Sequence, residues 1–144
     1  MSQSAPELEA ALSLDGGAVA REPGGAVRLV GSECRDCHAR VFPPTAVCPS
    51  CMSENMAPLT LSRRGTLYSW SVVHAAPRGW RLPFVAGYVD LPEGVRVFAH
   101  IVGGDPKALR FDMPVEVTTA VLGIDEQGHA LEGFAFEPVR NGGA

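Results

Sequence analysis

The sequence predicts a mostly β protein of 144 residues. Glycine and proline, at 16 and 12 residues, favour short strands and turns over long helices, yet they stay below the range typical of disordered chains. Segments in which Val, Leu, Phe and Tyr alternate with polar residues recur along the second half of the chain, as in half-buried strands. Four cysteines in two close pairs indicate a small cross-linked or metal-bound element ahead of those strands.

The composition argues against nucleic-acid binding and against a membrane span. Sixteen acidic and twelve basic residues give a net charge of -4, and the basic residues are scattered arginines plus the single lysine Lys107. A phosphate-binding protein usually carries a clustered basic stripe. No apolar run approaches the ~20 residues that span a bilayer, and the acidic N-terminus lacks the features of a signal peptide. We therefore expect a soluble, cytoplasmic protein with reduced thiols.

The N-terminal part, residues 1–26, is expected to hold a short helix and a linker. Ser4 and Glu7 form a capping-box pattern, apolar residues follow at helical spacing, and Gly16–Gly17 ends the helix. Three turns cannot stand alone, so this helix would dock on the body or on a partner, or else be a partly frayed tail. Residues 15–26, rich in glycine, predict the linker.

Residues 27–59 are expected to form a zinc ribbon. Cys34 and Cys37, then Cys48 and Cys51, follow the pattern C-x2-C-x10-C-x2-C. Two tight turns can aim four thiolates at one tetrahedral Zn²⁺, and a closed Cys₄ shell makes such a site structural rather than catalytic. Two disulfides or a redox C-x-x-C are the rivals, but a reducing compartment opposes the first and the paired repeat opposes the second. Iron is the alternative metal, because S₄ coordination also suits it.

A ribbon of this size needs its metal. It is shorter than the roughly 40 residues at which a chain usually buries a core unaided. Apparent zinc-binding energies of about 10–16 kcal/mol exceed the ~5–15 kcal/mol that stabilises a whole small domain. We therefore expect removal of the metal to unfold the ribbon.

Residues 60–140 are expected to form a small β barrel. Turn signals at Leu91–Gly94 and Asp125–Gly128 predict antiparallel hairpins, and Gly65 is interpreted as a bulge that bends a long first strand. The connection 103–114 is long enough for one helical turn. Together these features describe a five-stranded OB-fold barrel, with a six-stranded sandwich as the alternative on pattern alone. The expected strands are residues 59–62, 65–74, 84–90, 95–102, 115–122 and 131–139.

A longer series of motifs covers about residues 27–138. It comprises Cys34-Arg-Asp-Cys37, Val41-Phe-Pro-Pro44, Cys48-Pro-Ser-Cys51, Gly65-Thr-Leu-Tyr-Ser-Trp70, Val72-Val-His74, Leu91-Pro-Glu-Gly-Val-Arg96, Gly104-Asp-Pro106 and Met113-Pro-Val-Glu-Val117. In the order helix, Cys₄ ribbon and OB barrel, this series resembles the DUF35 family of rubredoxin-like ribbon plus OB-fold proteins. Two positions depart from it: His38 and Met52 follow the second cysteine of each pair, where the family usually has glycine, a residue suited to positive φ.

The resemblance implies an accessory subunit that is not itself an enzyme. Members of the DUF35 family form stable complexes with thiolases, hydroxymethylglutaryl-CoA synthases or thiolase-like aldolases that act on acyl-CoA thioesters, and the partner carries the catalytic cysteine and histidines. For this chain the resemblance implies a hetero-oligomer with a thiolase-fold catalytic subunit, structural zinc, and a role in complex assembly and CoA-substrate handling.

The loop of residues 75–83 is the candidate contact to CoA or to the partner. It joins the first two expected barrel strands, a position at which OB folds commonly bind ligands. Arg78 and Arg81 flank Trp80, a combination that can pair phosphates or carboxylates and stack on a planar base or fill a partner pocket. In the alternative interpretation, Trp80 folds back onto the barrel while the arginines stay solvated.

The sequence offers little for catalysis by this chain itself. All four cysteines are expected at the metal, which leaves no thiol nucleophile. The four histidines are far apart in sequence and none has a metal-ligand spacing. Two of them could meet at one barrel mouth, but hydrogen-bonded structural histidines are the plainer interpretation. The histidines are His38, His74, His100 and His129, of which His74 and His100 are the pair in question.

Two further functions stay open on the sequence. A zinc-ribbon and OB module that binds single-stranded nucleic acid needs a positive groove and stacking aromatic rings. The net charge opposes such a groove, whereas Trp70, Trp80 and Tyr88 could form a local platform. A stand-alone acyl-CoA binder is the other possibility, and it would bind CoA thioesters without any partner.

Overall fold

The computed structural model describes residues 18–22 and 24–139, so the helix expected near residues 4–17 lies outside the described residues. The described residues form nine strands and one short 3₁₀ turn, which confirms the mostly β class. They divide into two compact units: residues up to 63 with residues 92–95, and residues 64–91 with residues 96–139. No helix in the described ranges is long and apolar enough to cross a membrane.

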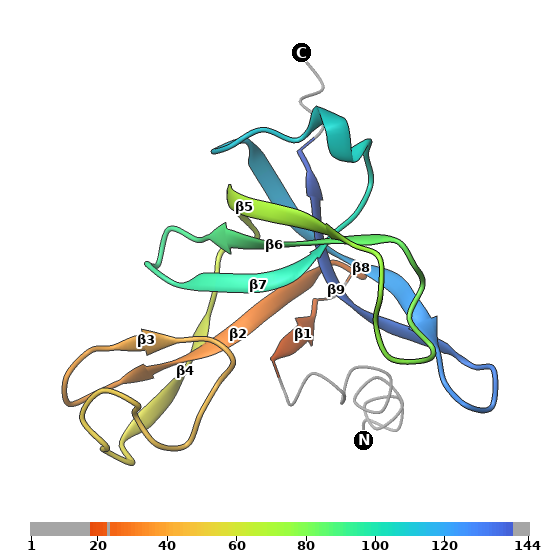
Figure 1. The fold of residues 1–144 in the computed structure, drawn as a ribbon. Helices are drawn as coiled ribbons and strands as arrows, with labels where there is room; N and C mark the ends of the chain where they lie inside the picture. The colour runs from red at the N-terminus through yellow and green to blue at the C-terminus, as the bar shows by residue number, and fades with distance from the viewer. Residues whose placement is uncertain (1–17, 23, 140–144) are drawn as a thin grey trace. The chain divides into compact units, whose positions relative to one another are not determined.

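The first unit is an antiparallel sheet built around its longest strand, β2 (Figure 1). Strand β2 pairs with β1 along its first half, with the very short β3 near its end, and with β4 along its second half. Strand β1 lies in the segment that was expected to be a linker, which is a correction to that expectation. Leu29 and Leu61 are fully buried in this unit. The strands are β1 Val19–Arg21, β2 Val27–Cys34, β3 Arg40–Val41 and β4 Met56–Thr60.

The second unit is a closed five-stranded barrel in the order β5-β6-β7-β9-β8. Strand β5 pairs with both β6 and β8, and β7 pairs with β9 in parallel while all other neighbours are antiparallel. This connectivity is that of an OB-fold, so the expected barrel is confirmed and the sandwich is excluded. The elements are β5 Arg64–Val73, β6 Phe84–Asp90, β7 Arg96–Ile101, the 3₁₀ turn η2 Pro106–Ala108, β8 Pro114–Ile124 and β9 Ala130–Pro138.

The bulge in β5 does not lie at Gly65, where the sequence suggested it. The register shifts between Leu67 and Ser69, so Tyr68 is the extra residue, and its ring is exposed. Gly65 has a different role, because a Cβ there would lie 2.4 Å from the backbone oxygen of Asp90. Glycine is needed at position 65 because any side chain there would block the close approach of β5 to the end of β6.

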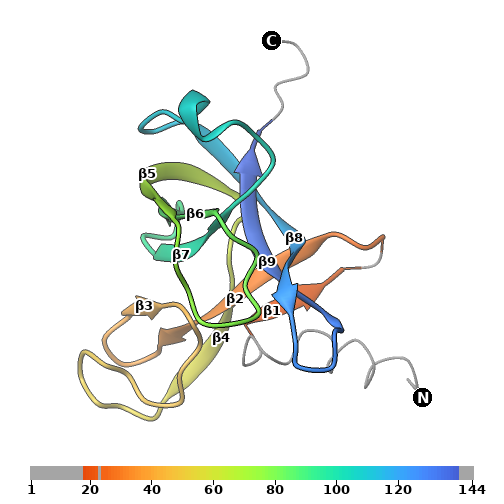
Figure 2. The ribbon, with the colours of Figure 1, turned by 45° about the vertical axis from the view of Figure 1, so that its right-hand side comes forward.

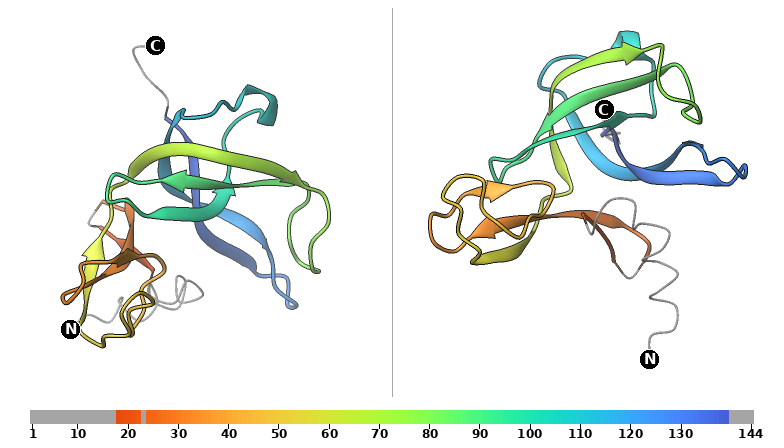
Figure 3. Two further views of the ribbon diagram at one scale, coloured as in Figure 1. Left: turned by 60° about the vertical axis from the view of Figure 1, so that its left-hand side comes forward. Right: turned by 60° about the horizontal axis from the view of Figure 1, so that its bottom comes forward.

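The barrel core is filled from all five strands. Each strand turns alternate side chains inward, as a closed barrel requires. Strands β5, β6 and β7 lie side by side as one layer, and β8 and β9 form a long hairpin (Figures 2 and 3). The fully buried side chains of this unit include Leu67, Val89, Val97, Val115 and Phe136.

Candidate metal centre and barrel site

The four cysteine sulfurs lie within 4.8 Å of one another. Cys34 Sγ is 3.7 Å from Cys51 Sγ, and Cys37 Sγ is 3.6 Å from Cys48 Sγ. Four thiolates placed tetrahedrally at about 2.3 Å from Zn²⁺ would be roughly 3.8 Å apart, whereas a disulfide needs about 2.0 Å. All four cysteines are free. The spacing therefore fits one tetrahedral ion and excludes the disulfide alternative in this structure.

The two cysteine turns have the same backbone geometry. The N–H of His38 donates to Cys34 O at 2.9 Å, and the N–H of Met52 donates to Cys48 O at 2.9 Å. Both residues are in the left-handed region, with φ of 66° at His38 and 69° at Met52. The chain thus makes both turns without glycine at these two positions, at a steric cost of about 1–2 kcal/mol per residue.

Backbone donors and neighbouring sulfurs pull the thiol pKa values in opposite directions. The N–H of Cys37 donates to Cys34 Sγ at 3.4 Å, and this lowers the pKa of Cys34 to about 6. Cys48 likewise accepts from the N–H of Cys51, which lowers its pKa. The N–H of Ser53 favours the thiolate of Cys51, but the three other sulfurs and burial outweigh it and raise the pKa of Cys51 to about 12. A cation at the centre of the cluster would remove this conflict, because it favours all four thiolates together.

A hydrogen-bonded carboxylate links the two cysteine turns. Asp36, between the first two cysteines, accepts from Ser53 Oγ at 2.5 Å and from Asn55 Nδ2 at 3.3 Å, both just beyond the last cysteine. The Ser53 hydrogen bond lowers the pKa of Asp36, so this carboxylate is ionised at neutral pH. The N–H of Arg35 also donates to Asn55 O at 2.9 Å. These bonds hold the turns in register independently of the sulfurs.

On the barrel, the loop before β6 is fastened to β8. The N–H of Ile124 donates to Gly79 O at 2.8 Å, and Trp80 forms an isolated bridge with Gly123. A Cβ at Gly123 would lie 2.2 Å from Gly79 O, and a Cβ at Gly79 would lie 2.6 Å from Ile124 O. Because both positions are glycine, the two backbones can approach closely, and the loop has a defined path.

Fastened in this way, Trp80 folds back onto the barrel, as in the alternative that the sequence left open. Its ring lies 5.3 Å from the His100 ring, nearly parallel at 12°, and 5.8 Å from the Phe84 ring. The Phe84 and His100 rings are 4.3 Å apart. Trp80 is nevertheless 42% exposed. The stack therefore leaves part of the Trp80 side chain exposed on the outside of β6 and β7.

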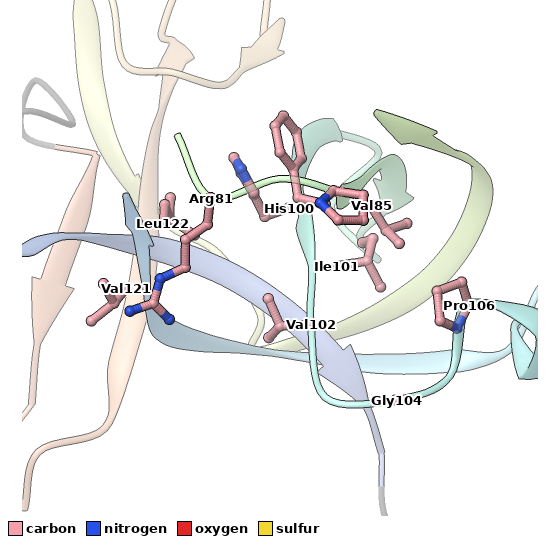
Figure 4. Close-up of a pocket in the computed structure, with 11 residues that line it drawn as sticks. Arg81, Val85, His100, Ile101, Val102, Gly104, Pro106, Val121 and Leu122 are labelled. Carbon is pink, nitrogen blue, oxygen red and sulfur yellow. The ribbon is translucent and has the colours of Figure 1, made fainter. Parts of the chain in front are cut away.

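Arg81 lies at a cavity of about 260 Å³ beside this stack (Figure 4). The rest of the wall is largely apolar and includes Ile101, Val102 and Leu122. Arg78 and Arg81 are both exposed, and neither guanidinium has an ion-pair partner among the residues that the structure describes. Unpaired guanidinium groups beside an exposed indole can bind an anion attached to a planar ring.

The other candidate residues are separated by the fold. The ring of Trp70 lies 4.9 Å from that of Phe111, and Tyr88 pairs with Phe98 instead. The platform of Trp70, Trp80 and Tyr88 suggested by the sequence is therefore not formed. His129 contacts Asp125 at 3.2 Å.

The sequence reasoning did not foresee the role of His100 in the stack. Nε2 of His100 is buried, and in the described part of the chain it has no hydrogen-bond partner. Burial lowers the pKa of His100, so its ring is neutral at pH 7. Only the β6–β7 register, which sets His100 opposite Ala86 and close to Phe84, could have indicated the stack.

A four-cysteine ribbon followed by a closed OB barrel defines the class of rubredoxin-like ribbon and OB-fold proteins. Residues 24–57 match the family described as the ChsH2 rubredoxin-like zinc ribbon domain, and residues 60–120 match the ChsH2 C-terminal OB-fold domain. The chain belongs to the DUF35/ChsH2 family, which confirms the resemblance.

Named relatives span most of the chain. It is 37% identical over 116 residues to benzoylsuccinyl-CoA thiolase subunit BbsA of Thauera aromatica, covering 81% of this chain and 80% of that protein. It is 33% identical over 115 residues to a DUF35 domain-containing scaffold protein of Pyrococcus furiosus, covering 78% and 84%. A solved structure, the Ltp2-ChsH2(DUF35) aldolase, is 30% identical with a TM-score of 0.62 and covers 77% of this chain and 84% of that chain.

The left-handed residues of the cysteine turns give a first testable prediction. Replacing both His38→Gly and Met52→Gly relieves about 1–2 kcal/mol of steric cost per site but adds roughly 0.5–1 kcal/mol of backbone entropy loss per site. We expect the double variant to raise the free energy of unfolding by about 1 kcal/mol, measured by thermal unfolding with zinc present. Ala39→Gly, at a position outside the left-handed region, is the control and should destabilise. A double variant no more stable than the parent would contradict the steric cost assigned to His38 and Met52 in the left-handed region.

The buried imidazole predicts a pH dependence. Because burial lowers the pKa of His100 in the folded state, the unfolded chain binds a proton more readily below pH ~6.5. His100 therefore contributes stability that is present above about pH 6.5 and is lost as the pH falls through its folded-state pKa. We expect His100→Gln to flatten the decline in melting temperature between about pH 7 and pH 5 relative to the parent. Parallel curves for the two proteins would show that His100 does not titrate in this range.

Proposed function

We propose that this chain is a non-catalytic accessory subunit of a thiolase-fold enzyme, a thiolase or thiolase-like aldolase, that acts on acyl-CoA thioesters in the cytoplasm. The observation that carries the proposal is the similarity over both ribbon and barrel to the BbsA thiolase subunit and to the Ltp2-ChsH2(DUF35) aldolase structure. In this role the chain assembles with the catalytic subunit and helps it hold the CoA substrate. The partner supplies the catalytic residues.

The four cysteines would hold one structural Zn²⁺. The fit of the sulfur spacing to a tetrahedral ion and the match to a zinc ribbon domain support this assignment. Four sulfur ligands leave no position for water or substrate, so the ion would stabilise the two turns and take no part in the reaction. The proposed division of the chain is accordingly an N-terminal segment of residues 1–26, a zinc ribbon of residues 27–59 and an OB barrel of residues 60–140.

Arg78, Trp80 and Arg81 would contact CoA. The exposed part of the Trp80 indole can stack on adenine, and the two unpaired guanidinium groups can pair with phosphate oxygens. The close glycine contact between the loop and β8 supports this function, because it holds the loop before any ligand arrives and so lowers the entropy lost on binding.

Co-expression of the full chain with a thiolase-fold protein encoded beside it tests the proposed function. We expect the two chains to copurify in a fixed stoichiometry and acyl-CoA turnover to require the catalytic subunit. Turnover of a CoA thioester by this chain alone would overturn the accessory role, and failure to associate with a thiolase-fold subunit would overturn the partner assignment.

The metal assignment predicts the effect of removing one ligand. Cys48→Ser leaves three thiolates and an incomplete shell, so we expect bound zinc to fall well below one per chain and the ribbon to unfold at lower temperature. Elemental analysis for zinc and iron together with thermal unfolding measures both effects. Ser50→Ala is the control, because it keeps the backbone N–H that donates to Cys48 Sγ at 3.3 Å. One zinc per chain with unchanged melting in Cys48→Ser would refute the assignment.

The loop assignment predicts weaker CoA binding without loss of fold. Trp80→Ala removes a stacking surface worth about 1–3 kcal/mol, so we expect the dissociation constant of CoA for the assembled complex to rise roughly 5- to 150-fold. Isothermal titration calorimetry measures the constant, and circular dichroism checks the barrel. Trp70→Phe, whose ring contacts Phe111 away from the loop, serves as the matched control. Equal affinity in Trp80→Ala and the parent would reject this contact.

A further inference from the structure

The outer face of strands β5, β6 and β7 carries three exposed aromatic side chains that the barrel core does not use. Tyr68 is 47% exposed, Tyr88 43% and Phe98 60%. They come from three neighbouring strands of one layer (Figure 3). We call Tyr68, Tyr88 and Phe98 the aromatic patch.

The patch is held in place before any partner binds. Tyr88 and Phe98 are direct cross-strand partners, with ring centroids 5.0 Å apart at 55°. The guanidinium of Arg96 lies 3.6 Å from the centre of the Tyr68 ring. Arg96 is itself fixed by two hydrogen bonds to Asp90, at 2.6 and 3.1 Å. Fixed rings lose little side-chain entropy on association, which favours tight binding.

The size and chemistry of the patch are those of an interface centre. Three aromatic side chains of ~150–250 Å² each, about half exposed, present on the order of 300 Å² of apolar surface. A standard interface buries about 800 Å² per partner, so the patch can supply its apolar centre while the polar surroundings supply its rim. Tyrosine and arginine are among the residues that dominate binding energy at such centres.

We propose that the aromatic patch is the docking surface for the thiolase-fold catalytic subunit, received by an apolar area on that subunit. This assignment rests on the proposed function, and it names the surface with which the chain would bind the catalytic subunit. Phe98 and His100 are two residues apart on β7 and therefore face the same side of the barrel. Docking at the patch would accordingly bring the Trp80 stack and Arg81 to the margin of the interface, where a CoA ester held by the partner can reach them.

The charge pattern disfavours nucleic acid as the occupant. The OB face of these strands can bind single strands, but only with cations that follow the backbone phosphates. Arg96, the cation that contacts the Tyr68 ring of the patch, is already bound to Asp90. The chain has a net charge of -4 and a single lysine. An apolar protein surface, which needs no phosphate contacts, suits the patch better.

The test compares variants of the full chain for affinity to the thiolase-fold subunit recovered by co-expression. The double variant Tyr88→Ala with Phe98→Ala removes the ring pair, and we expect its dissociation constant in biolayer interferometry to rise at least about 30-fold. Phe111→Ala removes an aromatic ring outside the patch that is more exposed than the patch rings, at 72%, and should leave the constant within about threefold. Circular dichroism checks that each variant is folded. A variant that carries Phe98→Leu in place of Phe98→Ala should regain most of the affinity for the subunit, because leucine keeps an apolar side chain.

Each outcome distinguishes this inference from the proposed function. If the parent binds the subunit and the double variant binds equally well, the docking assignment is wrong while the proposed function stands. If the parent binds no thiolase-fold subunit, both fall. Two other results would also overturn the assignment: self-association of the parent in sedimentation velocity that the double variant abolishes, or saturable binding of a labelled oligothymidine at low salt that the double variant abolishes.

Discussion

The ribbon depends on bringing four sulfur atoms to within 4.8 Å of one another. Two thiolates at 3.6 or 3.7 Å repel strongly unless a cation lies between them, and the opposite pKa directions of Cys34 and Cys51 express that conflict. The protein's own contribution is the backbone: paired turns, N–H donors to sulfur and the Asp36 link with Ser53 and Asn55. These bonds prepare a site that fits one tetrahedral metal ion.

The barrel is stabilised differently, by ladder hydrogen bonds that close on themselves and by a core of fully buried Leu, Val and Phe side chains. A closed barrel has no edge strand to protect, so its outer face is free to carry function. The contact of Gly79 with Gly123 positions the Trp80 loop, and cross-strand pairing positions the aromatic patch. Both features rely on the rigid backbone beneath them, in keeping with binding groups carried on a preformed scaffold.

Much of this architecture could be predicted from hydrophobic periodicity and cysteine spacing, because strong local signals in the sequence specify it. The C-x2-C pairs fixed the sulfur cluster, and the expected strands of residues 84–90 and 131–139 match β6 and β9 closely. Strand β1 was missed because three residues are too few for a recognisable alternation. The bulge was assigned to Gly65 because glycine is a common bulge residue, whereas the register shift at Tyr68 depends on pairing with β6. The stack of Trp80 on His100 likewise joins residues distant in sequence, which local patterns do not connect.

The aromatic patch is not evident from the sequence because its rings come from three strands whose pairing the local pattern does not specify. In a regular strand Leu67 and Ser69 would lie on one face and Tyr68 on the other. Because Leu67 is fully buried, this alternation alone already places Tyr68 on the outer face, and the bulge alters the alternation only of the residues that follow it. The pairing of β5, β6 and β7 then sets Tyr68 beside Arg96, on the face that Tyr88 and Phe98 occupy. The pairing of three strands thus gathers aromatic residues that are distant in sequence onto one face of the barrel.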